Sequence, residues 1–178
     1  MEPLLRVVLT GSESTGKTTL AADLAAHYGT VWSPEFARGY ADLKPGPLDH
    51  SDVEPIARGQ IAGEDEAARR ASRLLILDTD LLSTVVYSQH YYGRCPEWIE
   101  RAARKRLGDL YLLHQPDVPW VADGARRDQP QARRHLHACF EAALGAFGAR
   151  YVDLRGTWPE RRAAAIAAID ALRGVPST

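Results

Sequence analysis

The stretch from Gly11 to Thr18 reads GSESTGKT and matches the pattern GxxxxGK(S/T) in full. Glycines at both ends of the loop allow backbone angles closed to other residues, so main-chain N–H groups can approach phosphate oxygens. Lys17 would reach the β- and γ-phosphates of ATP, and the Thr18 hydroxyl would hold Mg²⁺. The motif therefore predicts a P-loop. Its ATP-binding residues are Gly11, Ser12, Glu13, Ser14, Thr15, Gly16, Lys17, Thr18 and Thr19.

Two carboxylates follow a third apolar segment, which reads LLILDTD. Asp78 directly follows four apolar residues, as does the acidic residue that ends a Walker B strand and holds Mg²⁺ directly or through water. We therefore expect Asp78 to act in catalysis and in metal binding. Asp80 is expected either to bind substrate or to cap the helix that begins at Leu81, since aspartate is a favoured N-cap residue.

The second apolar segment ends in SPEFARGY and supplies further polar groups. Glu35 is expected at the carboxyl edge of the sheet, where it could accept a hydroxyl proton or bind a sugar diol. Arg38 would clamp a phosphate or pair with Glu35, and the alternative is a surface ion pair. Tyr40 is a candidate to stack on a planar substrate ring.

Arginines are concentrated in the segment PWVADGARRDQPQARR. Trp120 and Asp123 are predicted to contact substrate. Arg126 or Arg127 would neutralise charge on the transferring group from a lid that excludes water. A merely solvated basic loop is the alternative.

The elements that must position these residues alternate between apolar strands and helical patterns. Strands are expected at 4–10, 30–33, 74–78, 110–114 and 151–154. This order is typical of an α/β fold with a five-stranded parallel sheet covered by helices. A long insertion from 43 to 72, with a helix from about residue 53, is expected to form a wall of the substrate pocket. Thr157 and Glu160 form a capping box that predicts the start of the last helix.

Length and composition indicate one domain spanning residues 1–178. The formal net charge of −1 argues against binding to nucleic acid, and no apolar stretch is long enough for a membrane span. The N-terminus has no pattern of an export signal, so we expect a cytoplasmic protein. The histidines and the two cysteines lack ligand-like spacing, which gives no reason to predict a structural metal.

Several motifs together resemble the ribosylnicotinamide kinase domains of NadR-type bacterial NAD-biosynthesis proteins. They are GSESTGKTT, PEFARGY, IARGQ, LDTDLLST, YYG and PWVADGAR, and they span nearly the whole chain. The resemblance implies a P-loop NTPase fold, ATP and Mg²⁺ as cofactors, and phosphorylation of the 5′-hydroxyl of nicotinamide riboside. It carries over Lys17, Thr18, Glu35, Arg38, Asp78, Asp80, Trp120, Asp123 and Arg126.

Two departures from this family leave other functions open. Nothing precedes Met1 and no HxGH nucleotidyltransferase signature is present, so we expect a stand-alone kinase for a small-molecule riboside. A deoxynucleoside or nucleoside monophosphate kinase is the first alternative. A non-catalytic nucleotide-binding switch is the second, although the sequence lacks the NKxD loop typical of guanine specificity. The oligomeric state is left open.

Overall fold

The computed structural model describes residues 3–119 and 130–174 and contains a five-stranded parallel sheet. The strands are β1 (Leu5–Thr10), β2 (Val31–Ser33), β3 (Leu74–Asp78), β4 (Leu110–His114) and β5 (Tyr151–Leu154), in the spatial order β2-β3-β1-β4-β5. The predicted strands 74–78, 110–114 and 151–154 are confirmed to the residue, and the first two begin one residue later than predicted. All strand pairs are parallel, so their carboxyl ends lie at one edge.

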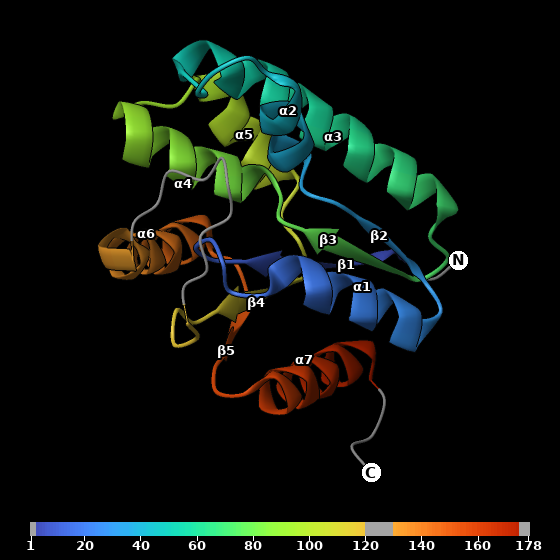
Figure 1. The fold of residues 1–178 in the computed structure, drawn as a ribbon. Helices are drawn as coiled ribbons and strands as arrows, with labels where there is room; N and C mark the ends of the chain where they lie inside the picture. The colour runs from blue at the N-terminus through green and yellow to red at the C-terminus, as the bar shows by residue number, and fades with distance from the viewer. Residues whose placement is uncertain (1–2, 120–129, 175–178) are drawn as a thin grey trace.

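Helices cover both faces of this sheet (Figure 1). They are α1 (Lys17–Tyr28), α2 (Phe36–Leu43), α3 (Val53–Arg70), α4 (Leu81–Tyr92), α5 (Glu97–Lys105), α6 (Pro130–Phe147) and α7 (Trp158–Arg173), with a short 3-10 helix, η1 (His50–Asp52). No helix in the described ranges is long and apolar enough to cross a membrane. The α/β P-loop class predicted from the sequence is confirmed.

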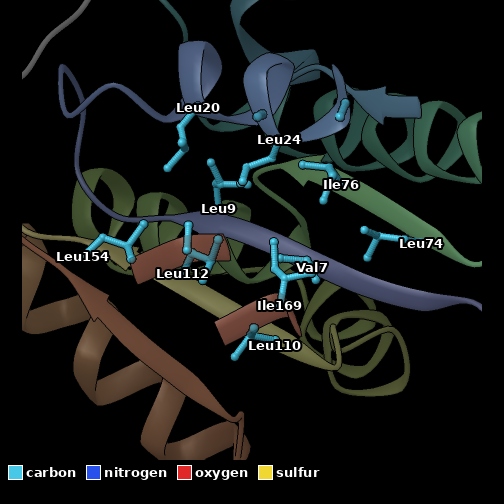
Figure 2. Packing of buried hydrophobic residues seen from close by; sticks show 13 residues of the cluster. Val7, Leu9, Leu20, Leu24, Leu74, Ile76, Leu110, Leu112, Leu154 and Ile169 are labelled. Carbon is cyan, nitrogen blue, oxygen red and sulfur yellow. The ribbon is translucent and has the colours of Figure 1, made fainter. Parts of the chain in front are cut away.

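The two faces of the sheet form separate apolar clusters because successive strand residues point in opposite directions. Val7 and Leu9 of β1 pack with Leu20 and Leu24 of α1 and with Ile169 of α7, as Figure 2 shows. Val8 points to the other face, where α3, α4 and α6 contribute the covering side chains. Burial on both faces explains why the central strands are nearly continuous apolar runs.

The last helix begins as its sequence predicts. Thr157 and Glu160 form the capping box, and Glu160 accepts hydrogen bonds from both the backbone N–H and the hydroxyl of Thr157 at 2.7 Å. Arg161, in the next turn, is buried and donates to the carbonyl oxygens of Gly156 and Gln115. These bonds fix the entry of α7 beside the end of β4.

Candidate active site

The loop after β1 has the backbone that its glycines predict. Gly11 adopts φ 123° and Gly16 adopts φ 84°, both in the region that disfavours side chains. A Cβ on Gly11 would also lie 2.8 Å from the carbonyl oxygen of His114. The imidazole of His114 is buried and its Nδ1 donates to the carbonyl of Thr15 at 2.9 Å, which requires an Nδ1–H tautomer. The end of β4 therefore packs against the P-loop and holds it through His114.

Lys17 begins α1 and is only 8% exposed. Its Nζ donates to the carbonyl oxygen of Ser12 at 2.6 Å, so the side chain folds back over the loop. Burial lowers the pKa of Lys17, whereas the carboxylates of Glu35, Asp78 and Glu13 oppose that shift. The ammonium group thus lies where three acidic side chains and the loop meet, which is suitable for a group that must contact phosphate.

Thr18 and Asp78, which the sequence predicts to bind Mg²⁺, lie in contact with each other. The Thr18 hydroxyl donates to Asp78 Oδ2 at 2.5 Å. The second carboxylate oxygen of Asp78, Oδ1, is buried and has no hydrogen-bond partner among the described residues. A hydroxyl beside a carboxylate with an unsatisfied oxygen matches the oxygen ligands that Mg²⁺ prefers. These residues therefore fit a site that would hold a hydrated Mg²⁺ ion and supply positive charge near the phosphates.

We expect Asp78→Asn to lower kcat and to raise the Mg²⁺ concentration that gives half-maximal rate, by about 10- to 100-fold. A neutral amide holds a hydrated cation less well than a carboxylate, and its N–H₂ would face the Thr18 hydroxyl. Magnesium titrations of initial rate check this. Asp23→Asn is the control, because Asp23 is a partly exposed carboxylate on α1 that pairs with Arg162. Superimposable titrations for wild type and Asp78→Asn would leave Asp78 with a structural role only.

Glu35 stands at the N-cap of α2, after β2 has ended at Ser33. Burial raises the pKa of this carboxyl, Lys17 and Arg38 lower it, and the nearby charge of Asp78 raises it further. A carboxylate with a raised pKa is better matched to accept a hydroxyl proton near neutral pH than an ordinary glutamate is. The structure thus brings Glu35, Lys17 and Asp78 together, as the sequence predicted.

Asp80 occupies a different environment. Its side chain caps α4 by accepting from the N–H of Leu82 at 3.0 Å, and it accepts from the Tyr111 hydroxyl at 2.5 Å. Burial, with the charge of Glu64, raises the pKa of Asp80 to about 7. The side chain is 4% exposed and does not line the cavity described next. Helix capping, the alternative that the sequence left open, therefore describes its contacts.

A cavity of about 490 Å³ opens beside the P-loop between α2, α3 and α4. Its aromatic wall is a stacked pair, Tyr87 and Tyr91, with ring centroids 6.0 Å apart and planes 9° apart. Within the part of the chain that the structure describes, Arg38 is the one cationic side chain that lines it. The lining carboxylates are Glu13, Glu35, Asp42, Asp49 and Asp52. Lys44 pairs with Asp49 and Asp52. The cavity therefore combines a tyrosine-bearing wall with an excess of negative charge from Glu13, Glu35 and Asp42.

Some predicted residues lie elsewhere. Tyr40 does not line this cavity, and its hydroxyl donates to Asp52 at 2.9 Å. Trp120, Asp123, Arg126 and Arg127 fall outside the described residues, so the predicted lid stays a prediction. Arg133, at the start of α6, is buried and donates to the carbonyl oxygen of Val118 at 2.9 Å.

Sequence reasoning missed Tyr87, Tyr91 and Gln60 as residues of this site. The tyrosines stand four residues apart on the helix that follows Asp80, a spacing that puts both on one helix face and could have identified the wall. Gln60 lines the cavity from α3 and is 3% exposed. It ends the IARGQ motif that contributes to the family resemblance, but no role was predicted for it from the sequence.

Comparisons with known proteins identify the family of this chain. A family model described as an AAA domain (AAA_28) matches residues 6–161. The trifunctional NAD biosynthesis/regulator protein NadR of Escherichia coli strain K12 is 33% identical over 124 residues, which is 67% of this chain and 30% of NadR. The NadR protein of Salmonella typhimurium gives the same figures. The chain thus spans about a third of the length of these curated relatives.

Solved structures extend the likeness to nearly the whole chain. A crystal structure of NadR in complex with NR covers 98% of this chain and 53% of that chain, with TM-score 0.79 and 26% identity. NadR in complex with NAD and AMP-PNP gives TM-score 0.80 and 25% identity. Thymidylate kinase from Candida albicans, at 13% identity and TM-score 0.68, shares the fold. The chain therefore belongs to the AAA_28 family of P-loop domains and is a NadR kinase-like domain.

Proposed function

We propose that this chain transfers the γ-phosphoryl group of ATP to the 5′-hydroxyl of nicotinamide riboside and so forms nicotinamide mononucleotide. The observation that carries the proposal is the acidic, tyrosine-walled cavity directly beside the Lys17 ammonium and the Thr18–Asp78 pair. The likeness to NadR in complex with NR supports it. The broader reaction class is phosphoryl transfer by a nucleotide-binding kinase. The likeness to NadR in complex with NAD and AMP-PNP and the fold shared with thymidylate kinase support this class.

The proposed reaction gives a role to each residue. The P-loop amides and Lys17 hold the ATP phosphates, and Lys17 stabilises charge that develops on the transferring group. Thr18 and Asp78 would hold Mg²⁺, which neutralises the phosphate charge when it is bound. Glu35 orients the acceptor hydroxyl and takes its proton. Arg126 and Arg127 are proposed to reach the transferring group from the lid.

The charge of the cavity favours a cationic acceptor. Nicotinamide riboside carries a fixed positive charge on its pyridinium ring, which carboxylates along the lining attract and which the face of Tyr87 or Tyr91 can stack against. A nucleoside monophosphate would instead bring about −1.5 to −2 charge at pH 7. Arg38 is the single cation that the described lining offers against that charge. This contrast favours a riboside over a monophosphate.

We expect kcat/KM to rank nicotinamide riboside above uridine and cytidine, and those above thymidine. The sharpest comparison uses reduced nicotinamide riboside, which has nearly the same shape but a neutral ring. Cation–π attraction of about 1–2 kcal/mol predicts a preference of about 5- to 30-fold for the charged ring. ATP consumption with each acceptor measures the ranking. If thymidine or thymidylate is the best acceptor, the proposal fails and a deoxynucleoside or thymidylate kinase replaces it.

A further inference from the structure

The side-chain amide of Gln60 connects three parts of the site. Its Oε1 accepts from the backbone N–H of Phe36 at 3.0 Å. Its Nε2 donates to Glu64 Oε1 at 3.1 Å and to the carbonyl oxygen of Thr79 at 3.3 Å. A backbone N–H can only donate and a carbonyl can only accept, so these partners fix which end of the amide is oxygen. The side chain is therefore held in one orientation.

Two of the partners adjoin the candidate catalytic carboxylates. Phe36 follows Glu35 at the start of α2, and Thr79 follows Asp78 at the end of β3. Gln60 thus ties the backbone beside the proposed base to the backbone beside the metal-binding carboxylate. Gln60 lies in the middle of α3, a long helix that packs against β2 and β3. The amide links two short segments to a rigid element.

The backbone of Thr79 needs such support. Its φ is 64°, in the left-handed region where a β-branched residue is a rare outlier. The N–H of Thr79 donates to the carbonyl of Leu9 at 3.0 Å, and its own carbonyl accepts from Gln60. Both peptide groups that flank this strained residue are thereby held. Strained backbone of this kind persists only where surrounding contacts over-determine it.

We propose that Gln60 is a positioning residue, which sets the placement of Glu35 relative to Asp78 by locking Thr79 in its left-handed conformation. The inference rests on the proposed phosphoryl transfer but does not depend on which acceptor is used. Gln60 acts through Phe36 and Thr79. Its loss should affect the chemical step more than the binding of ATP, because phosphoryl transfer requires the acceptor oxygen and the metal to be aligned.

Gln60→Glu tests this with the smallest change of shape. The glutamate keeps an acceptor for Phe36, but it loses both donors and faces the carboxylate of Glu64, which is 1% exposed. We expect kcat to fall by about 10- to 100-fold, with the KM for ATP within about threefold of wild type. Gln89→Met is the matched control, because its amide donates to Glu100 on the surface, and it should leave both constants unchanged.

A second variant distinguishes positioning from general damage to the fold. Asparagine tolerates the left-handed region far better than threonine does, so Thr79→Asn needs less help from Gln60. In the Gln60→Glu, Thr79→Asn double variant we expect kcat to recover at least threefold over Gln60→Glu alone, which a double-mutant cycle with Thr79→Asn quantifies. Thermal unfolding of all variants identifies those that are folded.

The rates are measured with whichever acceptor the wild-type protein uses best, so failure of the riboside proposal leaves this test intact. A folded Gln60→Glu protein with kcat within twofold of wild type would overturn the inference. Loss confined to the KM for the acceptor would also overturn it, because Gln60 would then bind substrate. Equal kcat in Gln60→Glu and in the double variant would show that Thr79 is not the residue through which Gln60 acts.

Discussion

Lys17→Ala is expected to reduce kcat by about 10²- to 10³-fold or more while the fold is kept. The ammonium is the buried cation beside Glu35 and Asp78, and it contacts the P-loop carbonyl of Ser12. Removing it takes away charge stabilisation from the transferring phosphoryl group. Single-turnover phosphoryl transfer with saturating ATP measures the loss of the chemical step directly.

The control for Lys17 is Arg69→Ala, which removes an exposed cation of α3 that pairs with Glu66. It should leave kcat unchanged. Circular dichroism and thermal unfolding establish that the Lys17→Ala protein is folded before rates are compared. Near wild-type turnover in a folded Lys17→Ala protein would remove the P-loop lysine from the mechanism.

Glu35→Gln should lower kcat by about 10²- to 10⁴-fold, with a smaller change in the KM for ATP. The amide keeps the size of the carboxylate and the N-cap position on α2, but it cannot take the proton of the acceptor hydroxyl. The comparison therefore isolates proton acceptance from shape. An unchanged kcat would remove Glu35 as the general base. That result would leave Asp80 or no base at all, which a loose transition state for phosphoryl transfer permits.

The pH dependence gives a second readout for Glu35. Burial raises the pKa of Glu35 above its ordinary value, and a base acts only when deprotonated. Activity should therefore fall as the pH drops through this raised pKa, and Glu35→Gln should lack that acid limb. The Asp80 carboxyl, with its pKa raised to about 7, remains in both proteins, so an acid limb that persists in the variant belongs to Asp80 or to another group.

The P-loop, Asp78 and the last helix cap could be predicted from the sequence, because each depends only on residues close to it in the chain. The P-loop follows a strand and precedes a helix, and its glycines are required by the backbone of one tight turn. Asp78 follows a short continuous apolar run, which is typical of a strand buried on both faces. The Thr157–Glu160 capping box likewise depends on neighbours three residues apart. In each case the physical cause and the sequence pattern lie within a few residues.

The tertiary structure decided which remaining residues belong to the site. Asp80 fits both a ligand and a helix cap by sequence. Its hydrogen bond from the N–H of Leu82 identifies the cap, and the Tyr111 hydroxyl, from β4, occupies its other carboxylate oxygen. Gln60 is recognised as a residue of the site only in the tertiary structure, because the packing of α3 beside the end of β3 brings its amide to Thr79. Tyr87 and Tyr91 line the cavity because α4 turns that face toward α2 and α3. Such contacts depend on how the helices are rotated and on which strands are adjacent. Packing throughout the buried core determines both, so the sequence around any one residue does not predict these contacts.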